Sequence, residues 1–212
     1  MENRSDILFL YDATMTNPNG DPLDDNKPRI VGDQEIVTDV RLKRTIRDFI
    51  IRNQEKDDFL IKRKAKVWLV DEKDEDGNQK TKDKLLEEKK DYWNYTDIRL
   101  FGATILSKGK ERGNEVFTGP VQFRIGVSLN KVNPIFIKGT TVSPSGKERK
   151  QGTFTERWVV EYALISFYGV FNPNISNENA SLKKELEVKK EDLETLYYSI
   201  WNGTKDLVSQ SK

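Results

Sequence analysis

The chain has 212 residues, with 36 Lys or Arg against 35 Asp or Glu, and it contains neither His nor Cys. This composition excludes Ser-His-Asp and Cys-His catalysis, zinc or iron–sulfur centres that need His or Cys, and disulfides. The carboxylates, lysines and hydroxyls that remain suit Mg²⁺-assisted chemistry at most, and the sequence predicts no resident metal or cofactor.

Length and hydropathy predict one domain with an elaboration, located in the cytoplasm. The first residues lack the hydrophobic region of a signal peptide, and the apolar runs Ile7–Tyr11 and Ala163–Phe171 are too short to span a bilayer. The near-zero net charge conceals two regions of opposite sign. Residues 27–66 hold twelve basic against seven acidic side chains, a net +5, and residues 71–97 hold six against ten, a net −4.

The first predicted strand is Asp6–Thr14, which is nearly all apolar and is therefore expected at the centre of a sheet. A loop from Asn17 to Arg29 follows, rich in Pro, Gly, Asn and Asp. A helix is predicted over Thr38–Arg52, with Thr38 as N-cap and Asp39 in the first turn.

The two sides of this first helix differ in chemistry. At 100° per residue, one arc is apolar and the opposite arc is basic. The apolar side chains are Leu42, Ile46, Phe49 and Ile50, and the basic ones are Arg41, Lys43, Arg44, Arg47 and Arg52. An ordinary solvated face of an amphipathic helix would give the same pattern.

Three further elements are expected in the middle of the chain. The sequence predicts a strand over Ala65–Val70 and, after a charged loop, a helix over Leu85–Tyr95 that ends in the aromatic group Tyr92, Trp93 and Tyr95. These aromatics suit core packing better than base stacking. Strict alternation predicts a half-buried strand over Val121–Leu129, with its odd-numbered side chains on the buried face.

The last third of the chain predicts a projecting hairpin, a strand and a helix. Lys138–Phe154 is poor in apolar residues and reads as a projecting hairpin or flexible loop. Its expected tip carries Lys147, Arg149 and Lys150. Val159–Phe171 is an apolar strand, and Lys189–Trp201 is a helix that Asn202-Gly203 should stop. The buried face of this helix should contain Leu193, Leu196, Tyr197, Ile200 and Trp201.

The polar loop before the first helix favours nucleic-acid binding. Asn17, Asn19, Lys27 and Arg29 precede the basic arc by a few residues, and amide side chains and loop N–H groups position phosphates and sugars. The competing interpretation is a pair of turns set by Pro18, Gly20, Pro22 and Pro28 without any ligand.

Four motifs in this order resemble the backbone subunit family of type I CRISPR effector complexes (Cascade), a crRNA-binding branch of the RAMP superfamily, and are most similar to its type I-B members. They are Asn17-Pro-Asn-Gly-Asp-Pro, Thr38 to Asp48, Asp97-Ile-Arg-Leu-Phe-Gly-Ala103 and Thr118-Gly-Pro-Val-Gln-Phe123. The likeness covers nearly the whole chain.

The resemblance implies an α+β fold, a modified RRM-like (ferredoxin-like) antiparallel sheet with an insertion at 71–118 and a thumb at 138–157. It implies a non-catalytic subunit that polymerises along CRISPR RNA with other Cascade subunits and presents the guide for pairing with target DNA, away from any membrane. The positions that would line the guide are Asn17, Asn19, Thr38, Arg41, Lys43, Arg44 and Arg47. Lys138–Arg157 would supply the thumb.

One departure and two alternatives accompany this interpretation. Members of the family generally continue beyond the last helix with a closing strand of the core sheet. Either that strand is provided differently here, or the product is shortened, and in the second case the open sheet edge should be unstable or paired with a neighbour. A metal-dependent ribonuclease of the type III backbone kind is the first alternative, with Asp21, Asp24, Asp25, Asp33 and Asp39 as available carboxylates. The second is a protein-interaction or regulatory module with an incidental basic helix.

Overall fold

The computed structural model describes residues 3–68, 91–105, 115–140 and 154–207, and shows a mixed α+β protein with a large antiparallel sheet. The chain forms two compact units. The sheet unit contains Leu8–Leu42 and Arg124–Tyr168, and the helical unit contains Lys43–Phe123 and Gly169–Asp206 together with the first residues. Each unit is described by itself.

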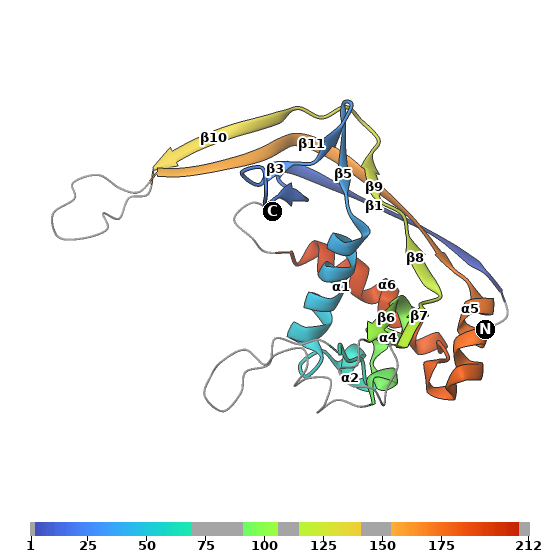
Figure 1. The fold of residues 1–212 in the computed structure, drawn as a ribbon. Coiled ribbons are helices and arrows are strands. Elements are labelled where there is room, and N and C mark those ends of the chain that lie inside the picture. Colours follow the sequence, from blue (N-terminus) through green and yellow to red (C-terminus); the bar gives the residue numbers. More distant parts are fainter. Residues whose placement is uncertain (1–2, 69–90, 106–114, 141–153, 208–212) are drawn as a thin grey trace, which may run out of the picture. The chain divides into compact units, whose positions relative to one another are not determined.

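The sheet unit is built on the strand order β1-β11-β9-β5-β4, with β10 pairing along β11. Pairs β4–β5, β5–β9, β9–β11 and β10–β11 are antiparallel. Figure 1 shows β10 and β11 as two long strands that run side by side. The strands are β1 (Ser5–Thr16), β4 (Ile30–Val31), β5 (Gln34–Val37), β9 (Gly126–Ser128), β10 (Pro134–Thr140) and β11 (Phe154–Phe171), and a small hairpin adds β2 (Gly20–Asp21) and β3 (Lys27–Pro28).

Strand β1 lies at the end of the strand order rather than at its centre, which corrects the expectation from its apolar composition. Its side chains alternate: Phe9 and Ala13 are buried, whereas Leu8 is 68% and Leu10 is 40% exposed. A largely apolar composition therefore does not make this strand central. Among the described residues, one face and one edge of β1 are uncovered.

The predicted strand Val121–Leu129 is divided into β8 (Val121–Phe123) and β9. Two residues between them, Arg124 and Ile125, shift the alternation by one, so that Ile125 and Leu129 are exposed instead of buried. A one-residue shift moves every later side chain to the opposite face. In β9, a Cβ on Gly126 would come within 2.5 Å of the Phe167 ring, so this position requires glycine.

The helical unit contains most of α1 (Asp39–Asn53) and all of α2 (Asp58–Lys62), α4 (Thr96–Phe101), α5 (Pro173–Leu182) and α6 (Lys190–Lys205). Strand β8 pairs with the end of β11, and β6 (Gly102–Ile105) pairs with β7 (Glu115–Thr118). Two 3₁₀ turns are η1 (Tyr92–Asn94) and η2 (Lys184–Leu186).

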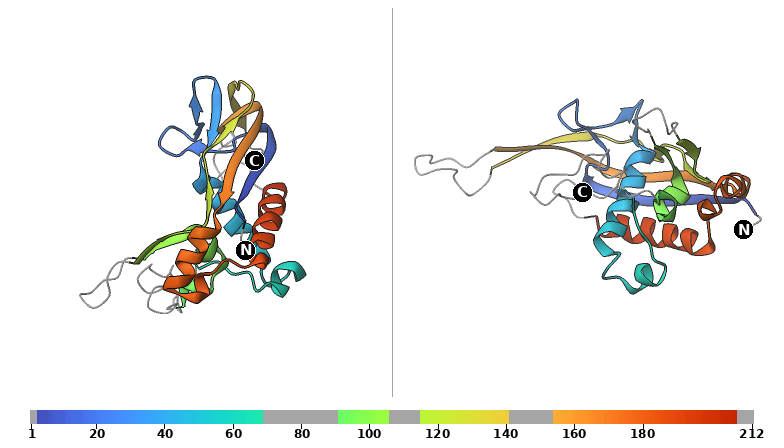
Figure 2. Two further views of the ribbon diagram at one scale, coloured as in Figure 1. Left: turned by 90° about the vertical axis from the view of Figure 1, so that its right-hand side faces the viewer. Right: turned by 60° about the horizontal axis from the view of Figure 1, so that its bottom comes forward.

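Helix α6 continues four residues past its expected end. A Cβ on Gly203 would lie 3.0 Å from Phe49 Cβ and 3.1 Å from the Thr45 carbonyl oxygen. Glycine here lets α6 cross α1 at close range, so it serves packing rather than termination (Figure 2). Tyr197 and Trp201 were expected in the core, but they are exposed, at 43% and 65%.

Two other elements differ from the prediction. Residues 65–68 of the expected strand Ala65–Val70 pair with no strand in the described part of the chain, although Ala65, Val67 and Trp68 are buried. Of the expected helix Leu85–Tyr95, residues 92–94 form the short turn η1, and residues 85–90 lie outside the described residues. The aromatic group does pack on the core of Trp68, Ile98 and Leu186, as expected.

Candidate nucleic-acid interface

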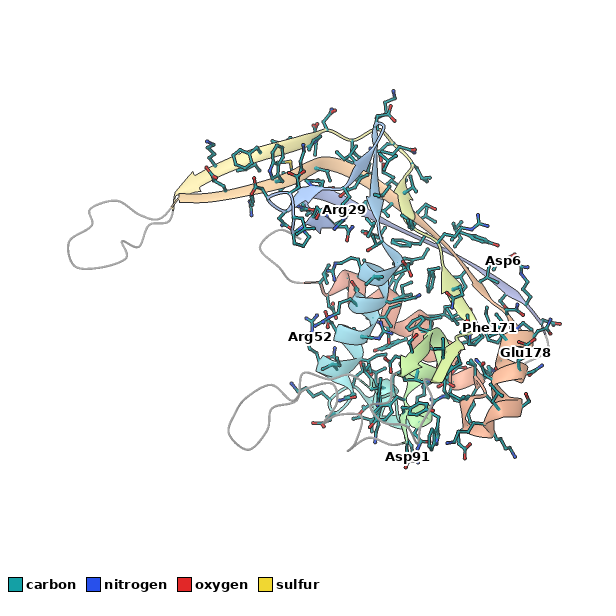
Figure 3. The ribbon with its side chains drawn as sticks, viewed as in Figure 1. Asp6, Arg29, Arg52, Asp91, Phe171 and Glu178 are labelled. Atoms are coloured by element: carbon teal, nitrogen blue, oxygen red, sulfur yellow. The ribbon has the colours of Figure 1, made fainter. Side chains whose placement is uncertain are left out.

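The polar loop in the sheet unit is held by its own side chains. Asn17 donates from Nδ2 to the Asn26 carbonyl oxygen at 2.6 Å, and Arg29 (Figure 3) forms an ion pair with Asp21 at 3.0 Å. Asn17 is 1% and Asn19 is 7% exposed. These two amides, expected on the surface, lie inside the loop and shape it.

The same loop contains unusual backbone conformations. Asp25 and Asn26 have positive φ values of 45° and 55°, and Met15 at the end of β1 has a φ of 54°. Asp and Asn tolerate this region, whereas Met does so at a cost of the order of 1 kcal/mol or more. A Cβ on Gly20 would come within 2.3 Å of Asn26 Oδ1, so the loop closes only with glycine there. The loop is therefore preorganised rather than adaptable.

Two buried polar atoms of this loop keep unused hydrogen-bonding capacity. Asn17 Oδ1 and Asn19 Nδ2 have no hydrogen-bond partner among the described residues. An unpaired buried polar group costs about 1–3 kcal/mol, so these two atoms lower the stability of the loop.

Cations of the sheet unit lie at the loop and at the start of α1. Lys27 Nζ lies 5.4 Å from the Trp158 ring centre, which brings β3 next to β11. Thr38 caps α1 as predicted, because its Oγ1 accepts a hydrogen bond from the Arg41 amide at 3.2 Å. The sheet unit contains all three of these basic residues, Lys27, Arg29 and Arg41.

The predicted thumb is described in part. Residues 138–140 and 154–157 continue β10 and β11 as a two-stranded arm. Lys147, Arg149 and Lys150 lie outside the described residues.

In the helical unit the basic side chains of α1 have specific partners. Arg47 Nε donates to Asp97 Oδ2 at 2.9 Å, and Asp97 has a side chain only 4% exposed. Arg44 pairs with Asp48 at 2.7 Å one turn later. Lys43 Nζ and the Arg47 guanidinium lie 5.5 and 5.3 Å from the Phe101 ring centre. Arg47 is therefore a structural cation, whereas Arg52 is exposed (Figure 3).

Two of the four motifs make specific contacts within the helical unit. Asp97 also accepts a hydrogen bond from the Trp68 amide at 3.0 Å. Arg99 donates to both carboxylate oxygens of Asp192. Gly102, with φ of 80°, lies so close to Gly119 that a Cβ on Gly102 would overlap the backbone of Gly119, and a Cβ on Gly119 the backbone of Gly102. The motifs at 97–103 and 118–123 thus hold α4, β6 and β7 together.

The sheet unit also contains a buried carboxyl that sequence reasoning missed. Glu35 is fully buried, and neither carboxyl oxygen has a hydrogen-bond partner among the described residues. Burial raises the pKa of Glu35 to about 8, which keeps it largely neutral at pH 7. Burial, together with the charge of Glu35, also raises the pKa of Tyr11 above its ordinary value. A single acidic residue in a four-residue strand gives no signal of burial.

Two of the carboxylates considered as catalytic candidates already have partners within the protein. Asp21 accepts from the Leu23 amide at 3.0 Å and pairs with Arg29. Asp33 pairs with Lys131 at 2.6 Å, and this cation lowers the Asp33 pKa. Within the described ranges, no three Asp or Glu side chains gather as a metal-binding group. No helix in those ranges is long and apolar enough to cross a membrane.

A model of the family described as "CRISPR-associated protein Cas7" matches residues 3–212. The chain belongs to the Cas7 family. A CRISPR-associated protein Cas7 of Haloferax volcanii is 31% identical over 239 residues, which cover 99% of this chain and 67% of the relative. The resemblance in the four motifs is confirmed.

Two solved structures share the fold of this Cas7 family member. A chain of a "CRISPR RNA-guided surveillance complex" superimposes with a TM-score of 0.54 at 14% identity, over 93% of this chain and 60% of that one. A chain of a "CRISPR RNA-guided surveillance complex, pre-nicking" gives a TM-score of 0.56 at 14% identity, over 99% and 74%. The chain thus spans 60% of the first structure's chain.

Proposed function

We propose that this Cas7 family member is a non-catalytic backbone subunit of a type I surveillance complex. It would bind CRISPR RNA, polymerise along it with further copies and other subunits, and present the guide for pairing with target DNA. Family membership and the fold likeness to chains of RNA-guided surveillance complexes support this assignment.

The strand order supports an RRM-like core. Along the chain, β1 is followed by helix α1, then β9, then β11, then α6, and the sheet unit orders these strands β1-β11-β9. Placing the first strand beside the third is the arrangement of a βαββαβ ferredoxin-like sheet. The outer edge of β1 is the position where such a sheet takes a further strand.

The observation that carries the proposal is the preorganised loop of the sheet unit. Its closely packed turn at Gly20 and its cations Lys27 and Arg29 occur within one segment. Cations held on such a loop suit a sugar-phosphate backbone, which offers acceptor oxygens and negative charge without base identity. We expect binding that is independent of sequence and weakened by salt.

Replacing Lys27 tests this assignment. In Lys27→Gln, a phosphate contact is lost, so the slope of log K against log salt for single-stranded RNA should become shallower by about 0.7. Lys131→Gln is the matched control, because Lys131 is an exposed lysine of the same unit whose partner is Asp33. Equal slopes for wild type and Lys27→Gln would contradict the proposed interface.

Polymerisation is tested with RNAs of increasing length. The number of copies bound, measured by native mass spectrometry, should rise in steps with RNA length. A single copy on every RNA would contradict the backbone role. Mg²⁺-dependent cleavage of complementary RNA that disappears in Asp24→Asn would instead establish the ribonuclease alternative.

A further inference from the structure

The segment between β9 and β10, residues 129–133, is the joint at which the β10–β11 arm meets the rest of the sheet. Before the joint, Ser128 lies opposite Ile165 of β11, and after it Pro134 lies opposite Val160. Six residue steps lead from Ser128 to Pro134, but only five lead from Ile165 to Val160, so the joint holds one extra residue. An extra residue of this kind bends a strand and changes the direction in which it continues.

Asn130 fills the gap that the joint leaves in the hydrogen-bond ladder of β11. In a regular antiparallel ladder, Leu164 would bond through both its N–H and its C=O to the main chain of the facing residue. Its carbonyl oxygen does accept from the Leu129 amide at 2.8 Å, but its N–H donates to Asn130 Oδ1 at 2.8 Å. Asn130 Nδ2 in turn donates to the Tyr162 carbonyl oxygen at 3.0 Å. The side-chain amide thus takes the place of a main-chain peptide group.

The main chain of the joint is bound by the β4–β5 hairpin instead. The Val132 amide donates to the Asp33 carbonyl oxygen at 2.9 Å, and Lys131 Nζ lies 2.6 Å from Asp33 Oδ2. At the end of β9, the Ser128 carbonyl oxygen accepts from Gln34 Nε2 at 2.7 Å. Because β5 of this hairpin leads into α1, the joint connects the arm with the start of that helix.

The direction of the arm decides whether it lies near the cations of the loop. Lys27 Nζ lies 5.4 Å from the ring centre of Trp158, which faces Phe136 across the arm. Asn130 is only half-buried, so water can replace its amide when the side chain is shortened. Water would satisfy the freed groups of β11, but it would not hold the two strands at a fixed angle.

We propose that Asn130 is a positioning residue for RNA binding, whose side-chain amide fixes the direction in which the arm leaves the sheet. This inference rests on the proposed function, since it concerns how the arm is held beside RNA that is bound at the loop. It assigns to Asn130 no contact with RNA.

The test measures the arm with pulsed electron–electron resonance between two spin labels, which the Cys-free chain accepts at engineered cysteines. One pair, Lys138→Cys with Asp12→Cys, reports on the arm relative to β1. A second pair, Asp12→Cys with Arg124→Cys, lies in the same unit outside the arm. In Asn130→Ala the first distance distribution should broaden and the second should keep its width. Asn133→Ala, at an exposed asparagine of the same joint, is the matched control and should broaden neither.

RNA affinity is the second measurement. If the freed arm keeps its original direction in about a tenth of the molecules, the affinity of Asn130→Ala for single-stranded RNA falls about 10-fold. Asn133→Ala should leave this affinity unchanged.

Asn130→Asp separates the two bonds of the amide. An ionised carboxylate still accepts from the Leu164 N–H, but it donates nothing to the Tyr162 carbonyl oxygen until it is protonated. The arm distribution should therefore be broad at neutral pH and narrow again toward about pH 4, near the ordinary pKa of Asp. The wild-type label pair at the same pH values controls for titration of Asp33 and other carboxylates. A width that does not depend on pH would contradict the role given to the Asn130 donor.

Three results would overturn the inference and leave the proposed function standing. An unchanged arm distribution in Asn130→Ala would show that the arm does not need the amide. Equal broadening of both label pairs would show that Asn130 supports the whole sheet. A broadened arm with unchanged RNA affinity would show that its direction does not affect binding. Wild-type protein that binds no RNA would overturn the proposed function itself, and the positioning role with it.

Discussion

The ion pair between Arg47 and Asp97 gives the sharpest stability prediction. Arg47 Nε lies 2.9 Å from Asp97 Oδ2, and the two side chains are 28% and 4% exposed. In Arg47→Met the carboxylate stays buried, bonded only to the Trp68 amide among its described contacts. Breaking a buried pair costs about 3–5 kcal/mol, and partial exposure of Arg47 places this one at about 3 kcal/mol.

The assay is urea unfolding at neutral pH, with the unfolding free energy extrapolated to water. A second variant, Arg47→Met with Asp97→Asn, removes the uncompensated charge while the amide oxygen still accepts from Trp68. It should lie within about 1 kcal/mol of wild type, because the two changes are strongly coupled.

Additive losses in the double variant, or a loss below about 1 kcal/mol in Arg47→Met, would refute this reasoning. Either result would mean that the Arg47 guanidinium forms no stabilising ion pair with Asp97. The pair also affects any RNA experiment on α1. A loss of RNA binding in Lys43→Ala with Arg47→Ala would mix unfolding with lost contacts, so Arg47 is better tested in the Asp97→Asn background.

Further predictions concern Glu35, Gly126 and Thr38. Because the folded-state pKa of Glu35 is raised to about 8, the carboxyl group takes up a proton on folding near neutral pH. The free energy of unfolding, measured with urea, should therefore fall by about 2–3 kcal/mol from pH 6 to pH 9. Glu35→Gln should remove most of this pH dependence, and an unchanged dependence would exclude Glu35 as its source. Gly126→Ala should cost about 1–3 kcal/mol because its Cβ would overlap Phe167, and a neutral result in thermal unfolding would contradict the close packing. Thr38→Ala should cost about 1 kcal/mol through loss of the N-cap, whereas Thr38→Ser should cost little.

Elements set by local chemistry were predictable from the sequence. Helix α1 and its cap at Thr38 were expected, because the apolar period and the capping residue lie within one segment. The sequence did not predict where α6 ends or that its aromatic side chains are exposed. Gly203 looks like a stop signal in the sequence, because Phe49 and Thr45, which occupy the space beside it, lie more than 150 residues earlier. Likewise, only the actual pairing of β8 and β9 shows that the alternation shifts after Phe123.

The surroundings of the candidate side chains depend on contacts that are distant in the sequence. The loop at Asn17 and the basic arc of α1 are the segments that the structure shapes, but Asn17 turns inward because the Asn26 carbonyl accepts its amide. Arg47 was expected among the open cations, and its partner Asp97 lies fifty residues away in another motif. The pairing of Phe136 with Trp158 depends on a strand register that neither segment reveals alone.

Binding of a single RNA backbone through several phosphates can be measured by fluorescence anisotropy titrations of two unrelated single-stranded RNAs over a series of salt concentrations. We expect the same affinity for both sequences and a slope of log K against log salt steeper than about −2, since each phosphate contact on a single strand contributes about −0.7. A slope near zero, or affinities that follow the base sequence, would contradict it.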